Sequence, residues 1–190
     1  MFISWAKKKT DKQIPRKSFR VLYSWGFTPN RLTFLSAVFK VLAGYFFYTG
    51  MFMWGGFAII FDYFFDFLDG GIARHLNKTT KRGAIYDFLA DRVLREGWII
   101  ALAFGGWISF ELALIVVLVD AFSYFFHDYA ELNKLKQIDW LPANHKFVVY
   151  GAFLGHMPLF LMIGIVVNAI FTVTNVVSLI VLNKEERDKE

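Results

Sequence analysis

Long apolar stretches alternate with short polar segments along most of this chain. A helix of about 20 apolar residues is needed to cross the hydrocarbon core of a bilayer. Six stretches approach or exceed that length, and they cover residues 30–49, 52–74, 83–104, 108–130, 145–163 and 165–183. The pattern therefore predicts an all-α integral membrane protein with six transmembrane helices.

A shorter segment of mixed character precedes the first of these stretches. Pro15 is well placed for a first helical turn. In a helix over residues 15–25 the apolar and basic side chains separate, with Phe19, Leu22 and Tyr23 on one face and Arg16, Lys17 and Arg20 around the other. We expect an interfacial amphipathic helix on anionic headgroups. The alternative is an ordinary basic segment beside the membrane.

The composition supports a membrane protein of one domain. Of the 190 residues, 56% are hydrophobic and 23 are Phe, which is too apolar for an ordinary soluble domain. The chain has no Cys, which excludes disulfides and thiolate metal sites. No apolar core with a cleavage site follows the basic start, so we expect no signal peptide. We predict one membrane domain over residues 1–190 with its core at 30–183.

Lys and Arg are unevenly distributed among the predicted loops. The loops near 49–51, 105–107 and 164 have none, whereas the N-terminal arm and the segments 77–82, 133–146 and 183–190 hold most of them. Positive loops stay on the cytoplasmic side. We therefore expect a multi-pass protein of the cell membrane with both termini in the cytoplasm.

Carboxylates interrupt two neighbouring apolar stretches at regular spacing. Asp62, Asp66 and Asp69 share one helical face, and Asp87 and Asp91 are one turn apart on the next stretch. Asp69 and Asp87 would both lie about 6–8 Å below the cytoplasmic surface. Ionised carboxylates at that depth need nearby cations. Oxygen ligands without Cys favour Mg²⁺, Mn²⁺ or Ca²⁺. The four carboxylates of Asp66, Asp69, Asp87 and Asp91 suggest two such ions.

The residues around these carboxylates fit a phosphate ligand. Gly70, Gly71 and Gly83 destabilise a helix but allow a ligand to approach the backbone. Arg74 can neutralise a phosphate in forked geometry, and Thr80 can donate a hydroxyl. At the start of the first stretch, Thr28 and Pro29 are typical of a helix N-terminus, whose free N–H groups favour anions.

These residues together resemble the signature of the CDP-alcohol phosphotransferases. Every fixed position of that pattern is filled, by Asp66, Asp69, Gly70, Ala73, Arg74, Gly83, Asp87 and Asp91. The resemblance implies transfer of a phosphatidyl-type or archaetidyl-type group from a CDP-lipid to a small alcohol, with release of CMP, in phospholipid biosynthesis. It implies that Asp66, Asp69, Asp87 and Asp91 bind two Mg²⁺ or Mn²⁺ ions and that Asp91 is also the general base.

The resemblance also implies a set of groups that hold the CDP-lipid. These are Gly70, Arg74, Thr80 and Gly83, with help from Pro29, Asn30, Arg31 and Leu32. It implies a homodimer, with membrane lipids and the two substrates as partners and no nucleic acid. Two other functions account for intramembrane carboxylates, namely a Mg²⁺-dependent prenyltransferase and a cation transporter. A cation transporter does not account for Gly70, Arg74 and Gly83, and the Asp-Gly-x-x-Ala-Arg pattern favours a CDP-lipid over a prenyl diphosphate.

The acceptor alcohol and the deeper charges complete the sequence predictions. The members that use inositol phosphate have arginines near the end of the fourth span, and this chain has none there. We expect His127, Lys134 and Lys146 to form a looser pocket for inositol phosphate, glycerol phosphate or another small alcohol. Lys40 and Asp62 lie at similar depths, about 15–18 Å into their spans. We predict that these two side chains pair.

Overall fold

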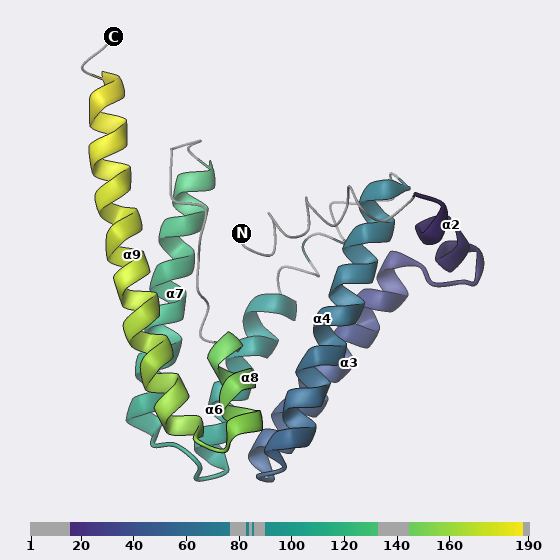
Figure 1. Ribbon diagram of the computed structural model, residues 1–190, viewed down its shortest axis with the longest axis horizontal. Helices are drawn as coiled ribbons and strands as arrows, with labels where there is room; N and C mark the ends of the chain where they lie inside the picture. The colour runs from purple at the N-terminus through teal and green to yellow at the C-terminus, as the bar shows by residue number, and fades with distance from the viewer. Residues whose placement is uncertain (1–15, 77–82, 84, 86–89, 133–144, 188–190) are drawn as a thin grey trace. The chain divides into compact units, whose positions relative to one another are not determined.

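The computed structural model is helical wherever it describes regular structure (Figure 1). It describes residues 16–76, 83, 85, 90–132 and 145–187. The chain forms two compact units, which meet in sequence between Ile108 and Ser109 and are described separately below. We call them the N-terminal unit and the C-terminal unit.

The N-terminal unit is built around two long antiparallel helices. These are α3 (Pro29–Tyr48) and α4 (Phe52–His75), which lie side by side in Figure 1. The turn between them contains Gly50 at φ 77°, as the predicted loop at 49–51 requires. Helix α2 (Arg16–Ser24), a π-helical turn (Ala90–Leu94) and α6 (Arg95–Phe104) complete the described part of this unit.

Helix α2 packs on the end of α4. The Phe19 ring is buried against Leu32 of α3 and Ile72 of α4. A methyl group at Gly71 would lie 2.5 Å from that ring, so only glycine leaves room for it. The helix predicted over residues 15–25 is present over Arg16–Ser24, and Pro15 lies outside the described residues. Its position on lipid headgroups stays a prediction.

The C-terminal unit contains α7 (Phe110–Leu132), α8 (His145–Leu154) and α9 (Met157–Arg187). Buried polar side chains join α7 to α9, and we call the set Asp120, Ser123, Asn168 and Thr172 the amide network. The Asn168 amide donates to Asp120 at 2.5 Å. The Ser123 hydroxyl donates to the side-chain oxygen Oδ1 of Asn168 at 3.2 Å and lies 2.5 Å from the Thr172 hydroxyl.

The predicted boundary between the last two spans is wrong. We expected a loop at 164, but Gly164 lies inside α9. The chain turns instead at Gly155, whose φ of 78° favours glycine, and Pro158 follows in the first turn of α9. Helix α8 therefore ends at Leu154 instead of 163. Its ten described residues extend only about 15 Å along its axis.

The other predicted stretches correspond closely to helices. The first, second and fourth match α3, α4 and α7 to within two residues at each end. The described end of the third is helical from Ala90 to Phe104. Among the described residues, three helices are long and apolar enough to cross a membrane, over Pro29–Tyr48, Phe110–Ala130 and Met157–Val181. These helices indicate association with a membrane.

Candidate active site

The buried face of α4 is acidic. Asp62 is completely buried, and Asp66 and Asp69 are each 6% exposed. The three carboxylates follow one another along this face at the predicted spacing, and buried apolar residues such as Ile59 and Ile72 lie before and after them. A helix places acidic side chains inside a protein only where other groups compensate them.

Helix α3 supplies that compensation from a polar stripe. Thr33, Ser36 and Lys40 are spaced i, i+3, i+7 and so lie on the face that meets α4. The Thr33 hydroxyl donates to Asp69 Oδ2 at 2.8 Å. The Ser36 hydroxyl donates to Asp62 Oδ1 at 2.7 Å. Each of these two carboxylates is therefore held by a donor from the neighbouring helix.

Ion pairs extend this arrangement to the segment that carries Asp91. Lys40 Nζ lies 2.6 Å from Asp62 Oδ1 and 3.1 Å from Asp91 Oδ1. Arg95 Nη2 lies 3.1 Å from the same oxygen of Asp91. We call Ser36, Lys40, Asp62, Asp91 and Arg95 the charged network. The predicted pairing of Lys40 with Asp62 is confirmed.

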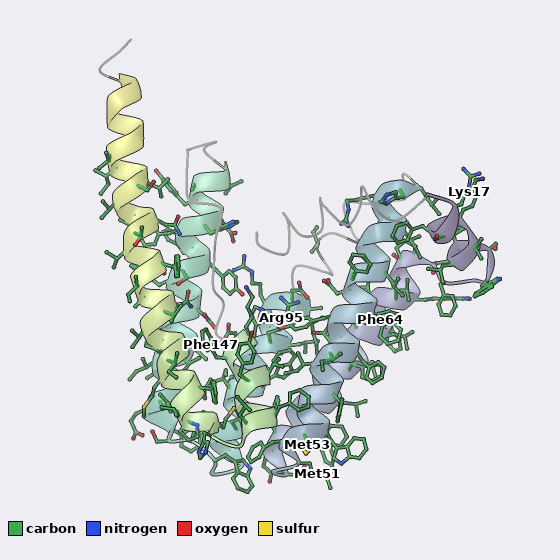
Figure 2. All side chains as sticks on the ribbon, viewed as in Figure 1. Lys17, Met51, Met53, Phe64, Arg95 and Phe147 are labelled. Atoms are coloured by element: carbon green, nitrogen blue, oxygen red, sulfur yellow. The ribbon has the colours of Figure 1, made fainter. Side chains whose placement is uncertain are left out.

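Arg95 begins α6 and faces α4. Its guanidinium lies 5.7 Å from the centre of the Tyr63 ring of α4 (Arg95 is labelled in Figure 2). Its positive charge also interacts with the carboxylates of Asp62 and Asp66. The positive charge of Arg95 therefore interacts both with the acidic face of α4 and with Asp91.

Asp91 lies in a π-helical turn over Ala90–Leu94. Such turns insert one residue into a helix and are frequent at functional sites. Asp91 is 25% exposed, far more than the carboxylates of α4. It is therefore the described carboxylate of this group that solvent or a substrate reaches most easily.

The side chain of Arg74 packs closely over Gly70. A methyl group at Gly70 would lie 2.8 Å from Arg74 Nη1, because the arginine side chain lies back over the glycine. Arg74 is exposed at the end of α4, one turn beyond Asp69 and Gly70. A bulkier residue at position 70 would displace this cation.

The start of α3 differs from the prediction. Thr28 is the N-cap and Pro29 the first helical residue, as expected, but the Thr28 side chain makes no capping bond. The amides of Arg31 and Leu32, which we expected to be free for an anion, both donate to the Thr28 carbonyl at 3.1 Å. The Arg31 guanidinium donates to Gly26 at 3.0 Å. The free-amide argument therefore fails for these two residues.

Several predicted site residues lie outside the described residues, namely Asp87, Thr80 and Lys134. Gly83 is helical and partly buried. Among the residues that the structure describes, no three His, Asp or Glu side chains are grouped as metal ligands. The predicted cluster depends on Asp87, so its geometry stays a prediction.

The acceptor candidates belong to the C-terminal unit. His127 on α7 lies 3.3 Å from the carboxylate of its neighbour Asp128, and Lys146 is partly buried in the first turn of α8. Asp128 also offsets the charge of His127 when the imidazole is protonated.

Sequence reasoning did not find Thr33 and Ser36 as partners of the carboxylates, and it did not pair Arg95 with Asp91. Signals were available for all three. Polar residues at i, i+3, i+7 in an otherwise apolar span, ending at Lys40, are typical of a face that meets polar groups on another helix. Asp91 and Arg95 are spaced i, i+4, which is the spacing of an ion pair on one helix.

Comparison with known proteins identifies the family to which a chain with this site belongs. Residues 27–183 match the profile of the CDP-alcohol phosphatidyltransferases. The chain belongs to the CDP-alcohol phosphatidyltransferase family. The match includes α3, α4 and the π-helical turn, and so all the described carboxylates of the site.

Two curated members of this family are similar to part of the chain. Archaetidylinositol phosphate synthase of Pyrococcus horikoshii is 30% identical over 56% of the chain and 57% of its own length. Phosphatidylinositol phosphate synthase of Mycobacteroides abscessus is 33% identical over 60% of the chain and 54% of its own length. The matched part of the chain thus spans little more than half of either relative.

Solved structures of the CDP-alcohol phosphatidyltransferase family share the fold. Phosphatidylinositol phosphate synthase (PgsA1) of Mycobacterium tuberculosis, with CDP-DAG bound, matches 88% of this chain and 94% of its own at a TM-score of 0.71 and 22% identity. Its complex with manganese and citrate matches 88% of this chain and 87% of its own at a TM-score of 0.67 and 24% identity. At these identities the likeness shows the fold.

Proposed function

We propose that this protein transfers a phosphatidyl-type or archaetidyl-type group from a CDP-linked lipid to the hydroxyl of a small polar alcohol and releases CMP. The observation that carries the proposal is the buried pair Asp66 and Asp69 on α4, next to Gly70 and Arg74 in the family pattern. A relative of the same fold binds CDP-DAG, which is a substrate of this class.

Two divalent ions would be held by Asp66, Asp69, Asp87 and Asp91. The donor set fits Mg²⁺ or Mn²⁺, because it consists of hard oxygens and the chain has no Cys. A relative of the same fold was solved with manganese. When bound, such ions neutralise a diphosphate and the charge that develops on the leaving CMP.

The side chains of this protein would bind, orient and move a proton. Arg74, lying over Gly70, would pair with the diphosphate of the CDP-lipid, assisted by Thr80, Gly83 and Asn30 at the start of α3. Asp91 would accept the proton of the acceptor hydroxyl as that oxygen attacks the lipid-side phosphorus. Its partial exposure supports this role.

The proposed reaction also indicates where the site lies in the membrane. One substrate is a lipid and the other is water-soluble, so the site belongs at the membrane boundary. We propose a single multi-pass domain with six spans, both termini in the cytoplasm, α2 on the headgroups and two chains in a homodimer. The length of α8 makes the fifth span the least supported of the six.

The acceptor is a phosphorylated polyol in this proposal. The two relatives described above are named for inositol phosphate lipids, and a third, from Mycoplasma genitalium, uses glycerol-3-phosphate by its name and is 35% identical over 66 residues. His127, Lys134 and Lys146 would provide cations for the acceptor phosphate. Single cations without a forked pair would discriminate weakly between the two acceptors.

The proposed function is tested by CMP release from the purified protein. The assay supplies CDP-diacylglycerol or its archaeal ether analogue with inositol phosphate, glycerol phosphate or an unphosphorylated alcohol, in the presence of Mg²⁺. We expect CMP only when a CDP-lipid, an acceptor and a divalent ion are all present. If the protein instead releases diphosphate from a prenyl diphosphate, it is a prenyltransferase and the proposal is wrong.

A further inference from the structure

Lys40 is a fully buried cation in contact with two carboxylates of different character. Its side chain is 1% exposed. Asp62 is completely buried and lies outside the eight positions of the family pattern, whereas Asp91 is part of that pattern and partly exposed. Lys40 thus connects a carboxylate with no proposed part in metal binding to the proposed general base.

The surrounding groups fix Lys40 in place. Its ammonium donates to the Ser36 hydroxyl at 2.6 Å and to Asp62 at 2.6 Å. The Trp98 indole of α6 donates to the Lys40 carbonyl at 2.8 Å, which pins the backbone of α3 at this residue. Three contacts thus hold Lys40 before its contact with Asp91 is considered.

The charges of this group balance. Lys40 and Arg95 carry two positive charges, and Asp62 and Asp91 carry two negative charges. Both cations contact the same oxygen of Asp91, each at 3.1 Å. Holding Oδ1 from two helices restricts the rotation of the carboxylate and leaves Oδ2 as the oxygen that can take a proton or a metal.

We propose that Lys40 is a positioning residue for Asp91, with Asp62 as the anchor that orients Lys40. The inference rests on the proposed function, because it assigns Asp91 the role of base. A misplaced base lowers the rate of the chemical step and leaves the binding of the CDP-lipid, which other groups hold, nearly unchanged. The competing explanation is that Lys40 only neutralises Asp62 within the fold.

A double variant separates the two explanations. Lys40→Met leaves Asp62 buried without its cation, so we expect a lower unfolding temperature in the metal-free protein. Lys40→Met/Asp62→Asn removes both charges and should restore much of that stability. If Lys40 positions Asp91, kcat for CMP release stays about 10- to 100-fold below wild type in the double variant, with KM for the CDP-lipid within about threefold.

A destabilised control comes from the C-terminal unit. Asn168→Leu removes the amide that donates to Asp120 and leaves that buried carboxylate without it. We expect a lower unfolding temperature but a kcat within about threefold of wild type at a temperature where the protein is folded. A fall in kcat equal to that of the double variant would show that destabilisation alone lowers the rate, and would overturn the inference.

The remaining outcomes are distinct. If the double variant regains both stability and kcat, Lys40 only neutralises Asp62 and the inference is wrong. If Lys40→Met does not fold, the double variant alone carries the test. If the wild-type protein releases no CMP from any CDP-lipid, the proposed function is wrong and the inference falls with it.

Discussion

The two units of this protein each bury a polar network between helices, but the networks differ in charge. The charged network of the N-terminal unit sets two cations against two carboxylates. The amide network of the C-terminal unit holds one carboxylate, Asp120, with the Asn168 amide and the hydroxyls of Ser123 and Thr172 close by. Buried polar groups need partners, and in the described part of the charged network Asp62 Oδ2 and Arg95 Nε have no hydrogen-bond partner.

The difference shows which network is built for more than packing. Neutral donors between membrane helices stabilise their association and need no ligand. Paired charges cost more to bury and return little net stability, so they are poor packing devices. The charged network also adjoins Asp66, the first residue of the family pattern, through the charge of Arg95 and along the buried face of α4. We therefore assign the chemistry to the N-terminal unit and packing to the amide network.

The largest expected contrast is between Asp91→Asn and Asp120→Asn. Asn at position 91 cannot accept a proton, so we expect kcat for CMP release to fall about 10²- to 10⁴-fold, with CDP-lipid binding largely intact. Asn at position 120 keeps an oxygen that can accept the Asn168 amide, and we expect activity within about threefold of wild type. Steady-state CMP release and CDP-lipid binding measure both. Near-normal turnover in Asp91→Asn would remove Asp91 from the role of base.

A smaller contrast is expected between two threonines. Thr33→Val deletes the hydroxyl that donates to Asp69 at 2.8 Å. We expect activity to fall about tenfold and more Mn²⁺ to be needed for half-maximal rate, since donors to a ligand carboxylate tune metal affinity. Thr172→Val deletes a hydroxyl of the amide network and should lower only the unfolding temperature. Equal Mn²⁺ requirements in the two variants would contradict the assignment.

Two glycines give a contrast in stability. Ala at Gly71 would place its methyl group 2.5 Å from the Phe19 ring, and we expect a loss of about 1–3 kcal/mol as α2 is displaced from α4. Gly97 in α6 has no heavy atom within 4 Å of an added methyl group, so Ala there should stabilise the helix by up to about 1 kcal/mol. Thermal unfolding in detergent compares them. A Gly71→Ala variant as stable as wild type would show that the Phe19 ring does not pack closely against position 71.

The smallest effects are expected at the acceptor. Lys146→Ala and His127→Ala should raise KM for a phosphorylated acceptor about two- to tenfold and leave kcat and KM for the CDP-lipid nearly unchanged, because each removes one single cation. His127 already has Asp128 beside it, so its effect should be the smaller. CMP release with inositol phosphate and with glycerol phosphate gives both constants. A strong preference for inositol phosphate that neither variant alters would contradict this pocket.

Features that depend only on residue types and their spacing could be predicted from the sequence. Charges in an apolar span need partners at their own depth, which is why the pairing of Lys40 with Asp62 was predictable. The spacing of Asp62, Asp66 and Asp69 fixed their common buried face in the same way. The pattern of the family depends on residue types at fixed intervals, so it was readable without a structure.

Other features depended on backbone geometry or on signals that were overlooked. Hydropathy is nearly uniform from 145 to 183, so either Gly155 or Gly164 could form the turn. Pro158, in the first turn of α9, favours a turn at Gly155, and the positive φ of Gly155 agrees with it. Nothing in the residues Ala90–Leu94 predicts a π-helical turn, whereas the i, i+4 spacing of Asp91 and Arg95 did favour their ion pair and was overlooked. The amides of Arg31 and Leu32 were taken as free because the bonds of a first turn depend on its tightness.

The central claim is that Asp66 and Asp69 of α4, with Asp87 and Asp91, hold two divalent ions. Its most direct test counts Mn²⁺ bound to the purified protein by electron paramagnetic resonance in the presence of a CDP-lipid. We predict two ions per chain for wild type and for Asp120→Asn, and the loss of at least one ion in Asp69→Asn. Wild-type protein that binds no Mn²⁺, or Asp69→Asn that binds two ions with unchanged affinity, would contradict the account.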